Sequence, residues 1–205
     1  MATYKVSYFP GKGNAEIIRL ALIASGQTFE DERLTREEWI KVKSNSPTKQ
    51  MPLLTVNGTV YGQSGACARY IARKFGLFGR TPEEELLIDE VYECIVDFQK
   101  EIAKVIYEKD DTKKAELKET VMTQHLPRLN EYITLRTKQF GENGYIIGPT
   151  MTLADLQLYN TVDQVGDRVD LGVFSAFPDL QKHADLVRSD HKVAEWIKKM
   201  PAPQN

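Results

Sequence analysis

The sequence predicts a small α/β domain followed by an all-helical domain. In the first 75 of the 205 residues, strand signals alternate with helix signals, whereas the remainder shows the three-to-four-residue spacing of apolar side chains that is typical of helices. Between these parts lies GLFGRTP, with two glycines and one proline in seven positions, a composition typical of a linker. We therefore expect domains at residues 1–75 and 83–205, joined by a linker at 76–82.

The first domain is expected to begin with a strand, a helix and a second strand. Apolar residues alternate over residues 4–9, and AEIIRLALIASG (15–26) has the pattern of a helix that ends at a glycine. TFEDERL (28–34) follows as the second strand. Thr35, with Glu38 three positions later, has the spacing of a capping box and predicts the start of a short helix.

A hairpin and a third helix complete this domain. Asn57 and Gly58 separate MPLLTV from TVYG, and Asn-Gly between two such stretches is a strong hairpin signal. A helix is expected from Ser64 to Lys74, with Gly76 as its stop signal. The order βαβ then ββα is that of a thioredoxin-like fold, in which the strand–helix–strand unit forms a parallel pair with a right-handed crossover.

The second domain is expected to start with two long helices. The second of these covers about residues 112–140 and should kink at Pro127, which lacks the N–H that a helix uses. Thr152 to Asp155 is another capping signal, with Met151 and Leu156 at the staple positions on either side. DLQKHADLV and HKVAEWIKKM predict further helices. The apolar face of the first long helix consists of Leu87, Val91, Ile95, Phe98, Ile102 and Ile106.

Composition and charge exclude several function classes. A net charge of −2 and a pI near 6.0 give no electrostatic case for binding nucleic acid or an anionic membrane. No apolar run approaches the roughly 20 residues that cross a bilayer, and the first residues lack the pattern of a secretory signal. Two cysteines, Cys67 and Cys94, suit a reducing compartment, so a cytoplasmic location is expected. The histidines, His125, His183 and His191, lack metal-ligand spacing, and no metal site is expected.

Tyr8 stands at the end of the first strand, immediately before the glycine-rich turn FPGKG. An aromatic residue at this place can fill a core, or its hydroxyl can be directed at a ligand held over the turn. Gln63 and Ser64 begin the third helix, whose first N–H groups lack partners and attract anions. Ser64 can be an ordinary N-cap, or it can receive a ligand carboxylate beside Gln63.

Two further segments have both a structural and a ligand-binding interpretation. Trp39 and Lys43 lie four residues apart on the short helix, either as part of a surface helix or as a wall and a cation for a second carboxylate. Gln50, Met51 and Pro52 lead into a strand whose exposed backbone could pair with a peptide-like ligand. Together with Tyr8, these signals describe a site for a small, extended, dianionic peptide, a description that matches glutathione.

The same segments carry a resemblance to a known family. YKVSYFPGKGNAEIIRLAL, WIKVKSNSPTKQMPLLTVNG, QSGACARYIARKFGL and MTLADL are together similar to the motifs of cytosolic glutathione transferases, most of all the sigma class. That class includes haematopoietic prostaglandin D synthase and many invertebrate enzymes. The resemblance covers nearly the whole chain.

The resemblance implies a role for each candidate residue. Tyr8 would donate a hydrogen bond to the glutathione sulfur and so favour the thiolate. The glycyl end of glutathione would be held by Trp39, Lys43 and either Lys49 or Gln50. The backbone of Met51, before a cis Pro52, would pair with the cysteinyl residue, and Gln63 and Ser64 would bind the γ-glutamyl group. Asp97 would reach the glutathione of a neighbouring subunit, which implies a homodimer.

The resemblance implies an electrophile pocket between residues 9–14 and the inner face of the first long helix. Phe9, Gly13 and Asn14 would line it from the first segment, and Gln99 from the helix. Asn14 stands where several relatives carry Arg. Gln99 and Lys104 are polar where the vertebrate prostaglandin synthase has a more apolar pocket. These departures weaken a specific prostaglandin assignment.

The expected function is conjugation of the glutathione thiolate to hydrophobic electrophiles. One alternative is glutathione-dependent isomerisation of a prostaglandin endoperoxide, in which the glutathione thiolate, stabilised by Tyr8, would attack the peroxide oxygen. Another is a non-catalytic carrier of haem or other hydrophobic ligands. Cys67 is interpreted as a small buried residue, which is the usual place of a free cysteine. A thiol-transferase would place its nucleophilic cysteine near the position of Tyr8, so the tyrosine there favours conjugation over disulfide exchange.

Overall fold

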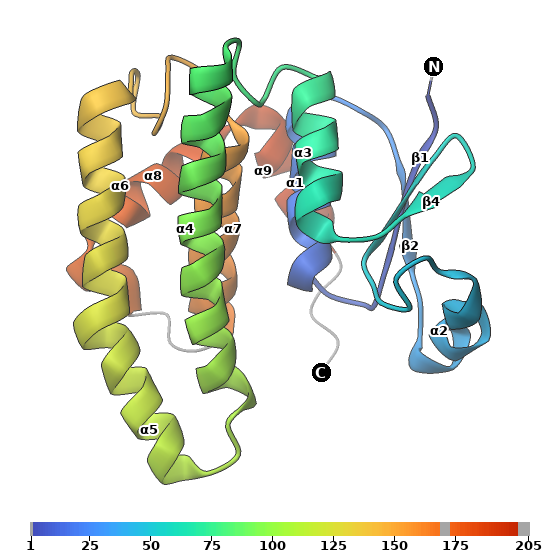
Figure 1. The fold of residues 1–205 in the computed structure, drawn as a ribbon, viewed down its shortest axis with the longest axis horizontal. Helices are drawn as coiled ribbons and strands as arrows, with labels where there is room; N and C mark the ends of the chain where they lie inside the picture. The colour runs from blue at the N-terminus through green and yellow to red at the C-terminus, as the bar shows by residue number, and fades with distance from the viewer. Residues whose placement is uncertain (1, 169–172, 201–205) are drawn as a thin grey trace. The chain divides into compact units, whose positions relative to one another are not determined.

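The computed structural model describes residues 2–168 and 173–200, and the chain divides into two compact units. One unit consists of Met1–Leu77 with Asp190–Asn205, and the other of Phe78–Ser189. The first is an α/β unit, and the second is built from helices in its described part (Figure 1). The predicted fold class, an α/β thioredoxin-like part followed by an all-helical part, is therefore confirmed.

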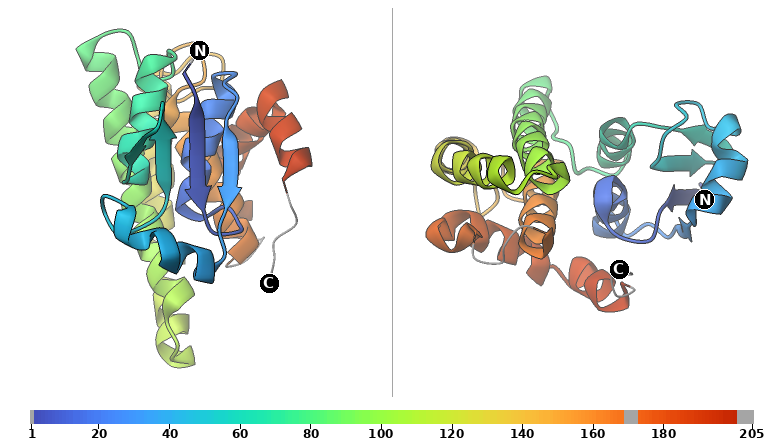
Figure 2. Two further views of the ribbon diagram at one scale, coloured as in Figure 1. Left: turned by 90° about the vertical axis from the view of Figure 1, so that its right-hand side faces the viewer. Right: turned by 90° about the horizontal axis from the view of Figure 1, so that it is seen from below.

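The first unit contains a four-stranded mixed sheet in the order β2-β1-β3-β4. Its strands are β1 (Tyr4–Tyr8), β2 (Glu30–Arg33), β3 (Leu53–Val56) and β4 (Thr59–Tyr61). β1 runs parallel to β2 and antiparallel to β3, and β4 is antiparallel to β3 (Figure 2, left). The parallel pair is joined through α1 (Glu16–Ala24), as the strand–helix–strand pattern predicts.

The helices of the first unit begin and end close to their sequence signals. A short 3-10 helix η1 (Gly13–Ala15) leads into α1, which lies beside α3 (Ser64–Lys74) on one side of the sheet (Figure 1). α2 (Arg36–Val42) starts with the predicted capping box between Thr35 and Glu38, and the 3-10 helix η2 (Lys43–Asn45) follows it.

The hairpin between β3 and β4 has the backbone that Asn-Gly predicts. Asn57 has φ +49° and Gly58 has φ +84°. Positive φ at both central residues matches the twist of the flanking strands in a two-residue turn. The turn therefore confirms both the hairpin and its position.

The described part of the second unit contains α4 (Pro82–Tyr107), α5 (Asp111–Thr120), a π-helical segment η3 (Val121–His125), α6 (Leu126–Phe140), α7 (Leu153–Arg168), a 3-10 helix η4 (Val173–Ala176) and α8 (Pro178–Ser189). α7 packs against both α4 and α8. Every residue from Met151 to Val162 is buried, so α7 forms the centre of this unit.

The single helix predicted over 112–140 is divided by the π-helical segment. The amide of Leu126 donates to the carbonyl of Val121, five residues earlier, instead of four. Pro127 follows at once and has no N–H to donate. The wider turn thus lies at the site where Pro127 predicts an interruption.

The start of α7 confirms the capping signal at Thr152. One carboxylate oxygen of Asp155 accepts hydrogen bonds from both the amide and the hydroxyl of Thr152, each at 2.8 Å, and the other accepts from the amide of Ile146 at 2.9 Å. Burial of this carboxyl raises its pKa to about 6, more than these hydrogen bonds lower it.

The last described helix, α9 (His191–Lys199), packs on α1 of the first unit. The sequence-based boundaries placed it in the helical domain, residues 83–205. Its amphipathic pattern predicts a helix with one apolar face, but such a pattern does not identify the partner that covers this face.

Candidate active site

The strand register places the candidate residues of the first unit along one edge of the sheet. Tyr8 is the last residue of β1 and pairs with Arg33, the last residue of β2. Ser7 pairs with Leu53, so Met51 and Pro52, just before β3, lie at this same edge. The arrowheads of β1 and β2 point to it, and α2 lies beside it (Figure 2, left).

Tyr8 and Gly13 are in close contact at this edge. A Cβ atom added to Gly13 would lie 2.6 Å from the hydroxyl oxygen of Tyr8 and 2.7 Å from its Cε1, closer than any real contact. Gly13 also has φ +45°, a conformation that glycine adopts without strain. The ring of Tyr8 is half-buried beside that of Phe9, with centroids 5.8 Å apart. The turn thus fixes the place of the hydroxyl.

The start of α3 provides unpaired backbone donors near this edge. Tyr61 at the end of β4 pairs with Leu54 of β3, and Gln63 follows two residues later. Within the described residues no side chain caps α3, and its first turn contains no acidic residue. The first N–H groups of a helix attract an anion under these conditions.

The interpretation of Ser64 as an ordinary N-cap is wrong. Ser64 is the first residue of α3 itself, and Gln63 occupies the N-cap position with φ +67° and ψ +101°. A residue with a side chain seldom adopts this backbone conformation, and such strain is concentrated at functional sites. The strained position is the one predicted to bind the γ-glutamyl group.

The segment after α2 brings three polar candidates towards the same region. Lys43, Lys49 and Gln50 are exposed, and the ammonium of Lys49 donates to the carbonyl of Ser44. A Cβ atom on Gly62 would lie 2.6 Å from Thr48 Oγ1, so this segment packs against the residue that precedes Gln63. Lys49, the residue after Thr48, therefore lies close in space to the residue before Gln63.

Trp39 and Met51 are placed differently from these exposed side chains. Trp39 is buried in α2, so most of its indole faces protein, and Met51 is half-buried. The peptide bond between Met51 and Pro52 is cis, as the resemblance implies. Asn14, in η1, is exposed.

Asp97 and Gln99 belong to α4 of the second unit. The Asp97 side chain is 73% exposed and forms an ion pair with Lys100 at 2.8 Å. The Gln99 amide group donates to Thr161 Oγ1 at 2.9 Å and accepts from Gln157 Nε2 at 2.8 Å. Sequence reasoning missed this link between α4 and α7, because polar residues on two helices carry no signal of pairing. Contact of Gln99 with an electrophile stays a prediction.

Cys67 is buried in α3, as its sequence-based interpretation expects. Its thiol lies 3.3 Å from the carbonyl oxygen of Gly62, to which it donates. Burial raises the pKa of Cys67 to about 11. A thiol with so high a pKa is almost entirely protonated at neutral pH and is a weak nucleophile.

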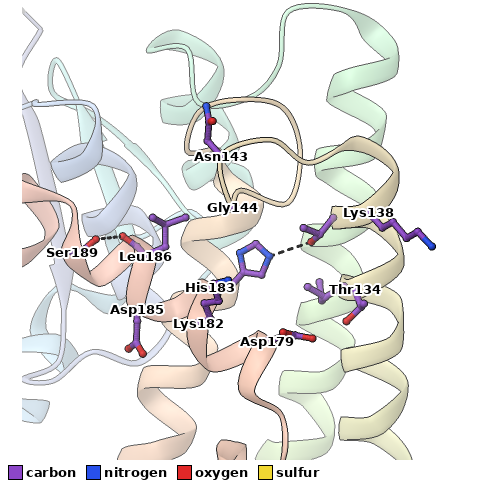
Figure 3. Close-up of a pocket in the computed structure, with 12 residues that line it drawn as sticks. Thr134, Lys138, Asn143, Gly144, Asp179, Lys182, His183, Asp185, Leu186 and Ser189 are labelled. Atoms are coloured by element: carbon purple, nitrogen blue, oxygen red, sulfur yellow. Dashed lines mark hydrogen bonds between the residues drawn. The ribbon is translucent and has the colours of Figure 1, made fainter.

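The second unit contains a cavity of about 610 Å³ whose lining includes none of the candidate residues above. Side chains of α6 and α8 and the loop at Asn143 and Gly144 line it, and the His183 imidazole reaches the Thr137 hydroxyl at 3.1 Å (Figure 3). Burial lowers the pKa of His183.

Two further properties concern the described residues as a whole. Over residues 2–168 and 173–200, no group of three or more His, Cys, Asp or Glu side chains could hold a metal ion. Over the same residues, no helix combines the length and the apolar character that a membrane span needs.

Comparison with known proteins adds the family. The family model described as the N-terminal domain of glutathione S-transferase matches residues 3–73, and that described as its C-terminal domain matches residues 96–200. The probable glutathione S-transferase 8 of Caenorhabditis elegans is 32% identical over 210 residues, which cover 100% of both chains.

Two solved structures share the fold over almost their whole length. Monomeric Na-GST-3, a glutathione S-transferase of the hookworm Necator americanus, is 34% identical with a TM-score of 0.89, covering 99% of this chain and 100% of that one. Prostaglandin synthase D of Nilaparvata lugens is 31% identical with a TM-score of 0.88, covering 98% and 100%.

These matches confirm the resemblance to glutathione transferases that the sequence motifs carry. Glutathione, the predicted co-substrate, is the co-substrate of the matched family. Both domain models match in the predicted order, and relatives more than 30% identical span the full chain. The protein belongs to the glutathione S-transferase family.

Proposed function

We propose that this glutathione S-transferase, of the sigma class, adds the glutathione thiolate to hydrophobic electrophiles and that Tyr8 activates the thiol. The observation that carries the proposal is the contact between the Tyr8 hydroxyl and Gly13, at the edge of the sheet where α3 begins. A thiol has a pKa of about 8.5 and is mostly protonated at neutral pH. A hydroxyl donor at the sulfur stabilises the thiolate and lowers that pKa.

The remaining candidates of the first unit fit the two ends of glutathione. The γ-glutamyl carboxylate would bind at Gln63 and Ser64, where the N–H groups of α3 begin. The backbone of Met51 would pair with the cysteinyl residue. The glycyl carboxylate would bind among Trp39, Lys43, Lys49 and Gln50.

The electrophile would contact Phe9, Gly13, Asn14 and Gln99. Because the thiolate is already formed, the rate gain would come from holding the two reactants in position. The physiological role would be detoxification in the cytoplasm. Asp97 would contact the glutathione of a second subunit in a homodimer, and its exposed carboxylate leaves it accessible for this contact. The hookworm relative is described as monomeric, so sedimentation of this protein is a necessary test.

A second candidate reaction is the isomerisation of a prostaglandin endoperoxide to the D form. It is favoured by the likeness to prostaglandin synthase D of Nilaparvata lugens. The same Tyr8-stabilised thiolate would attack the peroxide oxygen, and glutathione would be regenerated. Turnover of the endoperoxide with glutathione, compared with turnover of a halonitroarene, separates the two reactions. Retention on immobilised glutathione with neither turnover would indicate a carrier of hydrophobic ligands.

The direct test compares the wild type with Tyr8→Phe in conjugation of glutathione to a chromogenic chloronitrobenzene between pH 5.5 and 8.5. We expect a loss of about tenfold or more and a pH profile displaced upward in the variant, because one unit of pKa corresponds to tenfold in thiolate. Tyr4→Phe is the matched control, since Tyr4 begins the strand that Tyr8 ends. Equal activity of wild type and Tyr8→Phe would refute the role of Tyr8.

A further inference from the structure

A buried ionic cluster lies behind the turn that carries Gly13. Arg19 of α1 is 0% exposed and is the largest of the fully buried side chains in the described part of the chain. Its Nε donates to Asp31 Oδ1 of β2 at 2.8 Å, and its Nη1 donates to Glu16 Oε2 at 3.1 Å. The other oxygen of Asp31 accepts from Arg33 Nε at 2.9 Å.

Arg19 also binds the backbone of the turn itself. Nη1 lies 2.9 Å from the carbonyl oxygen of Gly11 and 3.4 Å from that of Lys12. These two carbonyls immediately precede Gly13, whose Cα faces the Tyr8 hydroxyl. The guanidinium therefore holds the backbone immediately before Gly13 by two hydrogen bonds.

The cluster continues into the C-terminal helix. Trp196 Nε1 of α9 donates to Glu16 Oε1 at 2.7 Å, and Glu16 is only 2% exposed. The Trp196 ring also packs on Phe29, with centroids 5.7 Å apart. Trp196 is thus hydrogen-bonded to the carboxylate that pairs with Arg19, although 180 residues separate it from Glu16.

Such a network transmits the loss of one member to the others. A buried carboxylate that loses a donor is under-solvated and moves towards its remaining partners. One carboxylate oxygen of Glu16 accepts from Trp196 and the other accepts from Arg19. Removal of the indole N–H would therefore alter the pairing of Glu16 with Arg19. Because Arg19 holds Gly11 and Lys12, the displacement would reach the turn.

We infer that Trp196 is a positioning residue for thiol activation, acting through Glu16 and Arg19. By this route α9 holds the turn of residues 11–13 in the geometry that sets the Tyr8 hydroxyl. The inference rests on the proposed role of Tyr8 and adds that α9 determines how well Tyr8 performs it.

The test is Trp196→Phe, which removes the N–H and keeps an aromatic ring against Phe29. We expect the apparent pKa of the pH profile for conjugation to rise by about half a unit, and so about threefold lower kcat/KM at acidic pH. The KM for glutathione should change less. Glu16→Gln, a second variant of the same link, should displace the profile in the same direction.

Two controls on the same contact surface separate positioning from stability. Lys192→Met removes the other hydrogen bond from α9 to α1, that of Lys192 Nζ to the carbonyl of Ala24 at 3.0 Å. Phe29→Leu loosens the packing of Trp196 but leaves its N–H in place. Both should lower Tm without displacing the pH profile.

The outcomes distinguish this inference from the proposed function. If Trp196→Phe and Glu16→Gln keep the wild-type profile while Tyr8→Phe loses activity, Tyr8 acts as proposed and the inference is wrong. A profile displaced equally in Phe29→Leu would also overturn it, because loose packing would then suffice. If Tyr8→Phe has the same activity and pH profile as the wild type, the proposed role of Tyr8 is wrong. The inference about Trp196, which rests on that role, is then wrong as well, whatever the Trp196 variant does.

Discussion

The hydroxyl of Tyr8 is packed so closely over Gly13 that no side chain fits at residue 13. We therefore expect Gly13→Ala to displace the Tyr8 ring and to reduce kcat/KM for conjugation by about tenfold to a hundredfold, the usual cost of a misplaced catalytic group. Steady-state kinetics on folded protein, checked by circular dichroism, measures this.

Gly76→Ala is the control for backbone strain at Gly13. Gly76 has φ +78°, and a Cβ atom there would meet nothing within 4 Å. This variant should lose about 1 kcal/mol of stability and keep its activity. Comparable activity losses in both variants would contradict the steric explanation.

Gln63 is expected to lower the stability of the protein and to strengthen glutathione binding. Its φ of +67° is costly for a residue with a side chain and costs glycine little. Gln63→Gly is therefore expected to raise the free energy of unfolding by about 1 kcal/mol and to weaken glutathione binding by loss of the amide. Chemical denaturation and calorimetric titration measure the two effects. Undiminished affinity would remove Gln63 from the site.

Asp155 should make the stability of the protein depend on pH in a defined direction. Burial raises the pKa of Asp155 from 3.8 to about 6, so the folded state favours the protonated carboxyl. The stability that Asp155 contributes is therefore complete below pH 4 and is lost as the pH rises towards 6 and above. The shift corresponds to about 3 kcal/mol.

Asp155→Asn provides the non-titrating reference for this effect. The difference in unfolding free energy between wild type and Asp155→Asn should decrease between pH 4 and 6.5 and then level off. Titration of the shared groups, such as His183, cancels in this difference. A difference that grows with pH would show that the hydrogen bonds from Thr152 and Ile146 outweigh burial.

Cys67 should be dispensable for catalysis and slow to react. Because burial raises its pKa to about 11, we expect alkylation by iodoacetamide at pH 7.5 to be far slower in the folded protein than in urea. Peptide mapping by mass spectrometry distinguishes Cys67 from Cys94. Cys67→Ala should retain conjugation within about twofold, and a large loss would revive the thiol-transferase alternative.

Local signals predicted much of the first unit because they act through a few neighbouring residues. The capping box at Thr35 and Glu38 and the hairpin at Asn57 and Gly58 need only local hydrogen bonds or positive φ, and both are present. Tyr8 and Gln63 lie near one edge because β3 stands between β1 and β4 in the sheet. The βαβ–ββα pattern predicted these strands and the parallel pair but did not specify this order.

Other features depend on partners distant in the sequence and gave no local signal. Gln99 lies 58 residues from Gln157, and Trp196 lies 180 residues from Glu16. A polar residue on a helix is compatible with solvent, with a ligand or with a second helix. The strain at Gln63 was also unforeseen, since its sequence resembles an ordinary helix start.

The π-helical segment before Pro127 also determines which side chains of α6 face the interior. A π turn holds one residue more than an α turn, and each residue of an α-helix advances by about 100° around the axis. If Val121–His125 formed an ordinary α-helix with the same number of residues, everything after it would rotate by about 100°. Leu126, Leu129 and Ile133, now buried, would turn away from the interior. The π turn accommodates one extra residue and thus keeps the side chains before and after it in phase.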